Sequence, residues 1–281
     1  MAAVASLLLR CSLVAAALAS SLAAHPQQIF SQAAAQALDR GFPDPRISWL
    51  LLDSHGNTLA ERWPDAQRPV PPGSLVKPFL AVAWGEQHDG AFPRVRCLGT
   101  RSRCWLPAGH GTLGLEDAIA QSCNAWFLAL AASLNRPRAS RIFARYGLAG
   151  PPITASQDSL IGFGVAWQET PSALASAYLH LIDDLHQPPW RNRILAGMQA
   201  SADHGTARSI DAALGFHAAL AKTGTAPCSH TPRAAADGFT LVAWPAQEPR
   251  LVLLVRIHGV TGAQTAAVAA QMLRRLGAGP S

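Results

Sequence analysis

The sequence reads Pro71-Pro72-Gly73-Ser74-Leu75-Val76-Lys77-Pro78-Phe79 where a helical pattern begins that continues to Gln87. Side chains three residues apart stack on one face of a helix, so we expect Ser74 and Lys77 to lie together. The free N–H groups of a first helical turn favour a developing negative charge, and Pro78 is tolerated only near such a start. The pattern predicts a nucleophilic serine with a lysine as its base.

Lysine is rare in this chain, since only Lys77 and Lys222 are lysines among 23 Lys and Arg residues. Arginine keeps its proton at physiological pH, whereas a buried lysine beside another cation can act as a neutral base. Lys222 is followed by Thr223, Gly224 and Thr225 at the end of a strand-like stretch. Gly224 lets a ligand or another backbone approach the strand. We expect the lysine and both threonine hydroxyls to face a carboxylate.

A third motif, Ser122-Cys123-Asn124, offers a hydroxyl and an amide for the far wall of a cleft. The same spacing recurs at Ser133-Leu134-Asn135, so this motif alone is not unique. The order S-x-x-K, S-x-N and K-T-G is far more specific than any one of the three motifs.

With these motifs the chain resembles the transpeptidase domain of the penicillin-binding proteins, over about residues 71–276. The resemblance implies a serine acyltransferase that acts on the D-Ala-D-Ala end of peptidoglycan stem peptides and is acylated by β-lactam antibiotics. Ser74 would be the nucleophile, Lys77 its base, and Ser122 the proton relay to the leaving amine. The resemblance implies no cofactor and no metal, and it leaves open whether water or a second stem peptide accepts the acyl group.

The resemblance also assigns the substrate-binding residues. Asn124 would hold the substrate backbone or Lys77. Lys222 would keep Lys77 neutral and, with Thr223 and Thr225 beside Gly224, bind the terminal carboxylate. The backbone N–H groups of Ser74 and Thr225 would form the oxyanion hole.

Two other functions fit the same motifs. A serine β-lactamase, of the class D kind, would need a further base for deacylation, and Glu169 precedes Thr-Pro instead of matching an E-x-x-L-N motif. A module that senses penicillin or peptidoglycan without turnover would also keep Ser74 and Lys77.

The remaining pattern predicts an α/β fold, in which an antiparallel sheet is flanked by helices and joined to a helical subdomain. A hairpin is expected over 47–60, and strands are expected over 216–225, 240–244 and 251–258. Helices are expected over 115–134, 171–185 and 263–276. We expect residues 25–281 to form a single domain.

The N-terminal segment, 1–24, consists almost entirely of Ala, Leu, Val and Ser with a single charge at Arg10, and it ends in small residues before a polar run begins at His25. This order is typical of a signal peptide cleaved near Ala23 or Ala24, with an uncleaved anchor as the alternative. We therefore expect a periplasmic or cell-envelope protein.

Export to an oxidising compartment would allow the cysteines to form disulfides. Cys97 and Cys104 are expected to form a disulfide across a Gly-Thr-Arg-Ser turn. Metal binding is the alternative, although the spacing is not C-x2-C and no His pair accompanies it. Cys123 is expected to be a buried thiol, and His110, between two glycines, to serve a turn.

Composition limits the remaining classes. The 281 residues are 49% hydrophobic and only 14% charged, which excludes a disordered polypeptide. The net charge is +6, but no long basic cluster is present, so no nucleic-acid partner is expected. Among the tryptophans, Trp105, Trp126 and Trp167 are expected to be core residues first and cleft residues second.

Overall fold

The computed structural model describes residues 26–184, 188–228 and 235–279. The predicted signal peptide lies outside the described residues. No helix within the described ranges is long and apolar enough to cross a membrane.

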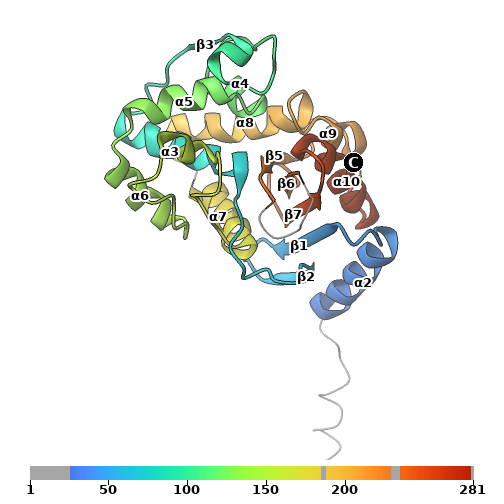
Figure 1. The fold of residues 1–281 in the computed structure, drawn as a ribbon. Coiled ribbons are helices and arrows are strands. Elements are labelled where there is room, and N and C mark those ends of the chain that lie inside the picture. The colour runs from blue at the N-terminus through green and yellow to red at the C-terminus, as the bar shows by residue number, and fades with distance from the viewer. Residues whose placement is uncertain (1–25, 185–187, 229–234, 280–281) are drawn as a thin grey trace, which may run out of the picture.

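A five-stranded antiparallel sheet forms the centre of the molecule, in the order β2-β1-β7-β6-β5 (Figure 1). Its strands are β1 (Ile47–Asp53), β2 (Thr58–Arg62), β5 (Leu220–Ala226), β6 (Asp237–Trp244) and β7 (Leu251–His258). A second, two-stranded sheet pairs β3 (Val95–Cys97) with β4 (Gly111–Leu113). The N-terminal hairpin and the C-terminal strands therefore share one sheet, as the sequence predicts.

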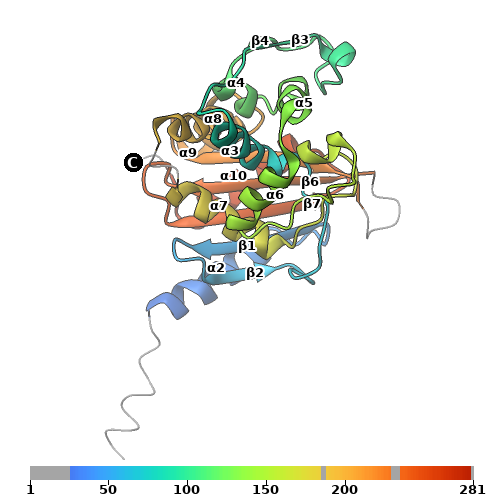
Figure 2. The same cartoon turned by 90° about the vertical axis from the view of Figure 1, so that its left-hand side faces the viewer.

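Helices cover both faces of this sheet (Figure 2). They are α2 (Pro26–Gly41), α3 (Lys77–Gln87), α4 (Leu115–Ala120), α5 (Asn124–Ser133), α6 (Arg136–Arg145), α7 (Pro171–Asp184), α8 (Asn192–Asp203), α9 (Ser209–Leu214) and α10 (Gly262–Arg275). The short 3-10 helices are η1 (Gly73–Val76), η2 (Gly99–Ser102), η3 (Gln157–Ile161) and η4 (Pro189–Arg191). The predicted class, an antiparallel sheet flanked by helices with a helical subdomain, is confirmed.

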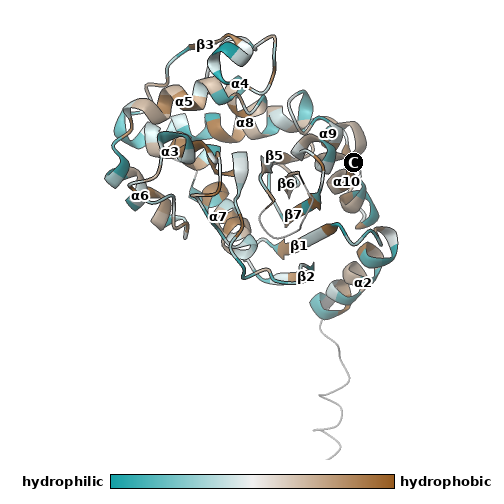
Figure 3. Ribbon diagram, viewed as in Figure 1, coloured by the Kyte–Doolittle hydropathy of each residue, from teal (hydrophilic) through white to brown (hydrophobic). Residues whose placement is uncertain are grey.

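Alternation along the strands produces two hydrophobic cores. In β1, Leu50 and Leu52 join the core under α3, α5 and α7, whereas Trp49 and Leu51 join the core under α2, α9 and α10. Successive side chains of a strand point to opposite faces, so one sheet can serve both cores. In Figure 3 the covering helices carry both brown and teal residues, as expected of helices with one buried and one exposed side.

The same alternation sets the direction of Lys222 on the edge strand β5. Leu220, two residues earlier, belongs to the core on the α3 and α5 side, and Ala221 belongs to the opposite core. Lys222 therefore faces the helical subdomain, where the other two motifs lie.

One helix prediction was wrong in an informative way. Residues 115–134 form two helices, α4 and α5, because the chain turns at Gln121, Ser122 and Cys123. Ser122 has a left-handed φ of 50°, which interrupts the helical hydrogen bonding. The apolar periodicity continues through this turn, so the pattern alone predicts a single helix.

Other boundaries shifted by a few residues. The α-helix predicted from Ser74 begins at Lys77, and Ser74 lies in the 3-10 turn η1 directly before it. The strand predicted from residue 216 begins at Leu220. The helix α2, at the start of the described chain, was not predicted.

Candidate active site

The S-x-x-K motif lies where η1 meets α3. Pro78 occupies the first turn of α3, where its missing N–H costs no helical hydrogen bond. The Tyr178 hydroxyl, on α7, donates a hydrogen bond of 2.6 Å to the Leu75 carbonyl oxygen, and this contact holds η1 against α7. Ser74 is partly exposed, and its hydroxyl is in hydrogen-bond contact with none of the described side chains. The nucleophile candidate thus faces the cleft from a rigid turn.

Lys77 follows this turn as the first residue of α3, and its side chain is fully buried. Its Nζ lies 2.7 Å from the Ser122 carbonyl oxygen, 2.6 Å from Asn124 Oδ1 and 3.3 Å from Ser122 Oγ. The sequence offered two roles for Asn124, and the structure places its amide oxygen on Lys77.

Lys222 reaches the same hydroxyl from the sheet. Its Nζ donates to Ser122 Oγ at 2.9 Å and to the Thr223 carbonyl oxygen at 2.8 Å, and the side chain is fully buried. Two amines therefore meet at one serine hydroxyl. The left-handed backbone at Ser122, unusual for a residue other than glycine, aims that hydroxyl between them.

Burial controls the protonation of these amines. Removal from water lowers the pKa of Lys77 to about 7, although the nearby Cys123 and Cys104 act in the opposite direction. Burial, and then repulsion from Lys77, holds the pKa of Lys222 well below its ordinary value. Lys77 can therefore lose its proton near neutral pH, as a general base requires, and Lys222 gives up its proton more readily than an exposed lysine does.

The K-T-G strand packs against the turn that carries the nucleophile. A Cβ on Gly224 would lie 3.0 Å from the Pro72 carbonyl oxygen and 3.0 Å from Leu75 Cγ. The close approach predicted for Gly224 is therefore made by another backbone segment. Thr225 is exposed, and its Oγ1 accepts a hydrogen bond of 2.9 Å from the Gly262 N–H.

A cleft of about 380 Å³ joins these elements. It is lined by Ser74, Trp105, Ser122, Asn124, Phe163, Thr206, Thr223, Gly224, Thr225, Thr261 and Ala263. Of the three tryptophans considered in the sequence, only Trp105 lines it, and Trp105 is 51% exposed, whereas Trp126 and Trp167 are buried.

The structure brings all three motifs together, as the sequence predicts. It also adds Thr206, whose Oγ1 lies 2.6 Å from Thr223 Oγ1, and Thr261 at the start of α10. Neither belongs to a motif with recognisable spacing, so no pattern in the sequence pointed to them.

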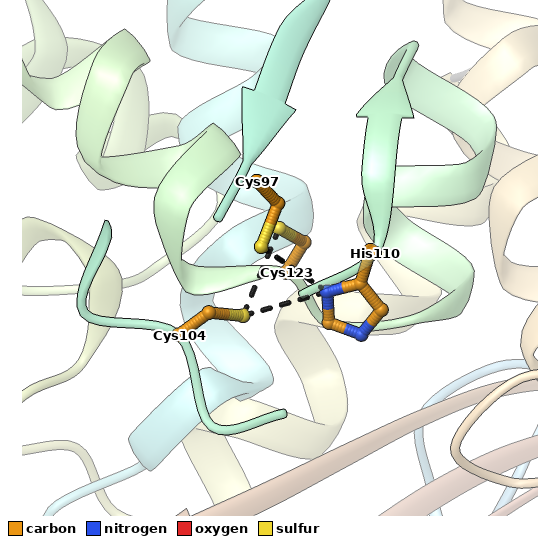
Figure 4. Close-up of side chains that lie close together, drawn as sticks. All are labelled: Cys97, Cys104, His110 and Cys123. Carbon is orange, nitrogen blue, oxygen red and sulfur yellow. Dashed lines mark hydrogen bonds between the residues drawn. The ribbon is translucent and has the colours of Figure 1, made fainter. Parts of the chain in front are cut away.

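The predicted Cys97–Cys104 disulfide is not present, and both residues are free cysteines. Their sulfurs instead gather with Cys123 Sγ and His110 Nδ1, all within 4.8 Å of one another (Figure 4). Burial alone would raise the pKa of Cys97, but hydrogen bonds from Gly99 and His110 lower it to about 6. Cys123 is buried, as predicted, and in contrast to Cys97 its burial raises the pKa of its thiol. His110, which was expected only to serve a turn, contributes a ring nitrogen to this cluster.

No protein-family model matches the sequence, and no curated protein does either. Solved structures do match the fold. Penicillin-binding protein 2 of Pseudomonas aeruginosa, solved in complex with WCK 5153, has a TM-score of 0.71 and 20% identity, covering 88% of this chain and 76% of the other.

Two isolated domains are similar over nearly their whole length. The transpeptidase domain of penicillin-binding protein 3 from Burkholderia pseudomallei has a TM-score of 0.67 and 17% identity, covering 91% of this chain and 96% of that domain. The transpeptidase domain of the D,D-transpeptidase FtsI4 from Legionella pneumophila has a TM-score of 0.64 and 19% identity, covering 90% and 96%. The chain therefore has the fold of a penicillin-binding protein transpeptidase domain.

Proposed function

We propose that the chain is a penicillin-binding serine acyltransferase that acts on the D-Ala-D-Ala ends of peptidoglycan stem peptides through a Ser74 acyl-enzyme. The observation that carries the proposal is the buried Lys77 amine, which is held by Ser122 and Asn124, two residues that line the same cleft as Ser74. A serine hydroxyl is a weak nucleophile until a neighbouring base takes its proton. The pKa of Lys77, lowered by burial to about 7, suits that task.

In the acylation step, neutral Lys77 takes the Ser74 proton while Ser74 Oγ bonds to the carbonyl carbon between the two D-alanines. The C–N bond then breaks, and the terminal D-alanine leaves as an amine. The Ser122 hydroxyl gives that amine its proton and regains one from Lys77, whose Nζ lies 3.3 Å away. The ester on Ser74 is finally transferred to water or to a second amine.

The strand β5 would bind the substrate on the other wall. An incoming carboxylate would favour the protonated form of Lys222. The Lys222 ammonium and the Thr223 and Thr225 hydroxyls would then donate hydrogen bonds to that carboxylate. The backbone nitrogen of Thr225 lies 3.1 Å from the position of a Cβ on Gly73, so β5 adjoins the η1 turn. The N–H groups of Ser74 and Thr225 can thus serve one oxyanion, at about 2.7–4 kcal/mol per donor.

A β-lactamase is the weaker alternative. The described residues that line the cleft include no carboxylate, and Glu169 accepts hydrogen bonds from Trp167 Nε1 and the Gly150 N–H elsewhere. A carboxylated Lys77, the class D base, would set a negative charge against the oxygens of Ser122 and Asn124 that now accept from Nζ. A sensor that keeps its acyl group stays a competing outcome.

The location and partners of the protein are part of the proposal. The predicted signal peptide supports export to the periplasm or cell envelope, where peptidoglycan is found. One similar structure is a complex of penicillin-binding protein 2 with MreC from Helicobacter pylori, of which this chain covers 62%. We therefore propose that cell-wall synthesis proteins are the class of partner to examine.

The test is the intact mass of the purified protein after incubation with benzylpenicillin, measured beside Ser74→Ala and Lys77→Arg. A lasting adduct on the unaltered protein, absent from both variants, is expected, since a guanidinium cannot accept the Ser74 proton. Hydrolysed drug without an accumulating adduct would indicate the β-lactamase instead. No adduct and no hydrolysis would overturn the acyltransferase, and an adduct on Lys77→Arg would overturn the proposed base.

A further inference from the structure

Four side chains that commonly bind metals converge beside the cleft. Cys97 ends β3, Cys104 follows η2, His110 precedes β4, and Cys123 lies between α4 and α5. Figure 4 shows the three sulfurs and the His110 ring pointing toward one another. Cys97, Cys104 and Cys123 are at most 5% exposed.

We propose that Cys97, Cys104, His110 and Cys123 form a four-ligand structural zinc site. Thiolate and imidazole ligands in a buried tetrahedral set favour zinc among the common divalent ions. Four protein ligands leave no open position for water, as in structural sites rather than catalytic ones.

The distances between the ligand atoms agree with one shared ion. Zn–S bonds of about 2.3 Å and Zn–N bonds of about 2.0–2.1 Å at tetrahedral angles separate two sulfurs by about 3.8 Å and a sulfur from a nitrogen by about 3.5–3.6 Å. Cys104 Sγ and Cys123 Sγ are 3.8 Å apart. His110 Nδ1 lies 3.5 Å from Cys97 Sγ and 3.5 Å from Cys104 Sγ. A disulfide would instead require about 2.05 Å between two sulfurs.

The backbone is shaped to hold these ligands. Cys97 pairs with Gly111 in the short sheet, which brings the preceding residue, His110, beside it. Gly99 and Gly109 have φ of +68° and +81°, and a Cβ on Gly99 would lie 1.9 Å from the Pro107 carbonyl oxygen. Only glycine fits such a close turn. The segment that follows Cys97 therefore packs directly against the segment that precedes His110.

The two residues next to Cys104 connect the cluster to the cleft. The Arg103 carbonyl oxygen accepts a hydrogen bond of 3.4 Å from Asn124 Nδ2, and Trp105 Nε1 donates to the Gln121 carbonyl oxygen at 3.0 Å. Arg103 and Trp105 flank the ligand Cys104. An ion at this site would thus hold Trp105 in the cleft wall and support the amide of Asn124, and so position residues for the chemistry without taking part in it.

Zinc content and affinity test the proposal directly. The full chain is purified without chelators under reducing conditions, and its metals are measured by mass spectrometry. The matched variants are Cys97→Ser, His110→Ala and, as a control outside the cluster, Cys228→Ser. We expect about one zinc per chain in the unaltered protein and in the control. Changes to residues that only hydrogen-bond a metal ligand cost about 10–100-fold in metal affinity, so loss of a ligand itself is expected to cost about a hundredfold or more.

Three measurements on the unaltered chain keep the test independent of variant folding. Cobalt added to the metal-free protein is expected to give the thiolate charge-transfer and visible bands of a tetrahedral site. Zinc removal is expected to expose the peptide bonds after Arg101 and Arg103, both exposed residues of the loop, to trypsin. Zinc binding is also expected to release up to three protons, one per bound thiol.

Several results would overturn the zinc site. These are an unaltered protein that binds no zinc against a competing chelator, a mapped Cys97–Cys104 disulfide, and equal affinity in Cys97→Ser and the unaltered protein. Loss of zinc in Cys228→Ser but not in Cys97→Ser would assign the metal to a second group of close side chains, Cys228, Asp237 and His258. None of these readouts depends on penicillin acylation, so the zinc site and the acyltransferase can fail separately.

Discussion

Lys77 and Lys222 share one hydrogen-bond acceptor, the hydroxyl oxygen of Ser122, from which their Nζ atoms lie 3.3 and 2.9 Å away. Both side chains are fully buried, and they come from a helix and a strand 145 residues apart in numbering (222 − 77). Two ammonium groups so close together in a dry site are strongly disfavoured. The arrangement therefore keeps at least one amine neutral near pH 7.

The pH dependence of penicillin acylation should report the protonation of Lys77. Its pKa, lowered by burial to about 7, means that the amine is protonated below that pH and free above it. The second-order acylation rate should rise about tenfold per pH unit below pH 7 and level off above it. Stopped-flow measurement with a chromogenic β-lactam between pH 5 and 9 tests this. A flat profile would contradict a lysine base.

Asn124→Asp should move that acid limb to higher pH. Asn124 Oδ1 lies 2.6 Å from Lys77 Nζ, and a carboxylate there would stabilise the charged amine and raise its pKa. Acylation at pH 7 should fall, and part of the rate should return at pH 8 to 9. Asn135→Asp, in the second S-x-N copy, is the matched control and should leave the profile unchanged. An unchanged profile for Asn124→Asp would show that this contact does not govern Lys77.

Tyr178→Phe should destabilise the protein and slow acylation together. The change leaves the buried Leu75 carbonyl oxygen without its partner, which costs about 1–3 kcal/mol in the free energy of unfolding. Urea denaturation gives the stability, and the β-lactam assay gives the rate. Tyr146→Phe is the matched control, because the Tyr146 hydroxyl donates a hydrogen bond to Asp184 and not to η1. This variant should lose stability with little change in the acylation rate. Equal acylation rates for both variants would show that the Tyr178 hydroxyl does not help to position Ser74.

Gly224→Ala should separate β5 from the nucleophile turn. The new methyl group would lie 3.0 Å from the Pro72 carbonyl oxygen, closer than ordinary van der Waals contact. Overpacking of this kind costs about 1–3 kcal/mol, and the displaced Ser74 should react more slowly. Gly279→Ala, whose Cβ position has none of the described residues within 4 Å, should be neutral in both measurements. A fully active Gly224→Ala would show that β5 and η1 need not touch.

Trp105→Ala should weaken ligand binding with little loss of stability. The indole is 51% exposed and lines the cleft, so its removal takes contact area from the ligand and little from the core. The concentration of benzylpenicillin for half-maximal acylation should rise several-fold, while the limiting rate stays similar. Trp126→Ala, by contrast, should cost about 3–5 kcal/mol in stability because Trp126 is fully buried. An unchanged half-maximal concentration would mean that Trp105 does not touch the drug.

Local patterns in the sequence predicted most of the sheet and all three motifs. The continuous β-branched and Leu-rich run of β7 gave its bounds correctly, because a strand buried on both faces is a short apolar run between turns. The rarity of lysine pointed to Lys77 and Lys222, since only a side chain with a removable proton serves as a base. The spacing of Ser74 and Lys77 placed both on one turn.

The errors share one cause, which is that long-range packing overrides local pattern. The apolar stretch 115–134 is broken at Ser122 because the turn there is held by buried contacts with Lys77 and Lys222, from distant segments. Cys97 and Cys104 suggested a disulfide because they are near in sequence, but the partners of their sulfurs, His110 and Cys123, follow later.

Periodicity and propensity act over a few residues, so the order of amino acids shows which chemical groups are present and which of them share a helix or a strand. It does not show that Lys222 of β5 reaches Ser122, that Thr206 joins the cleft, or that three cysteines and His110 converge. Those contacts join segments that only the packing of helices on the sheet brings together. Patterns over a few residues of sequence do not predict these distances.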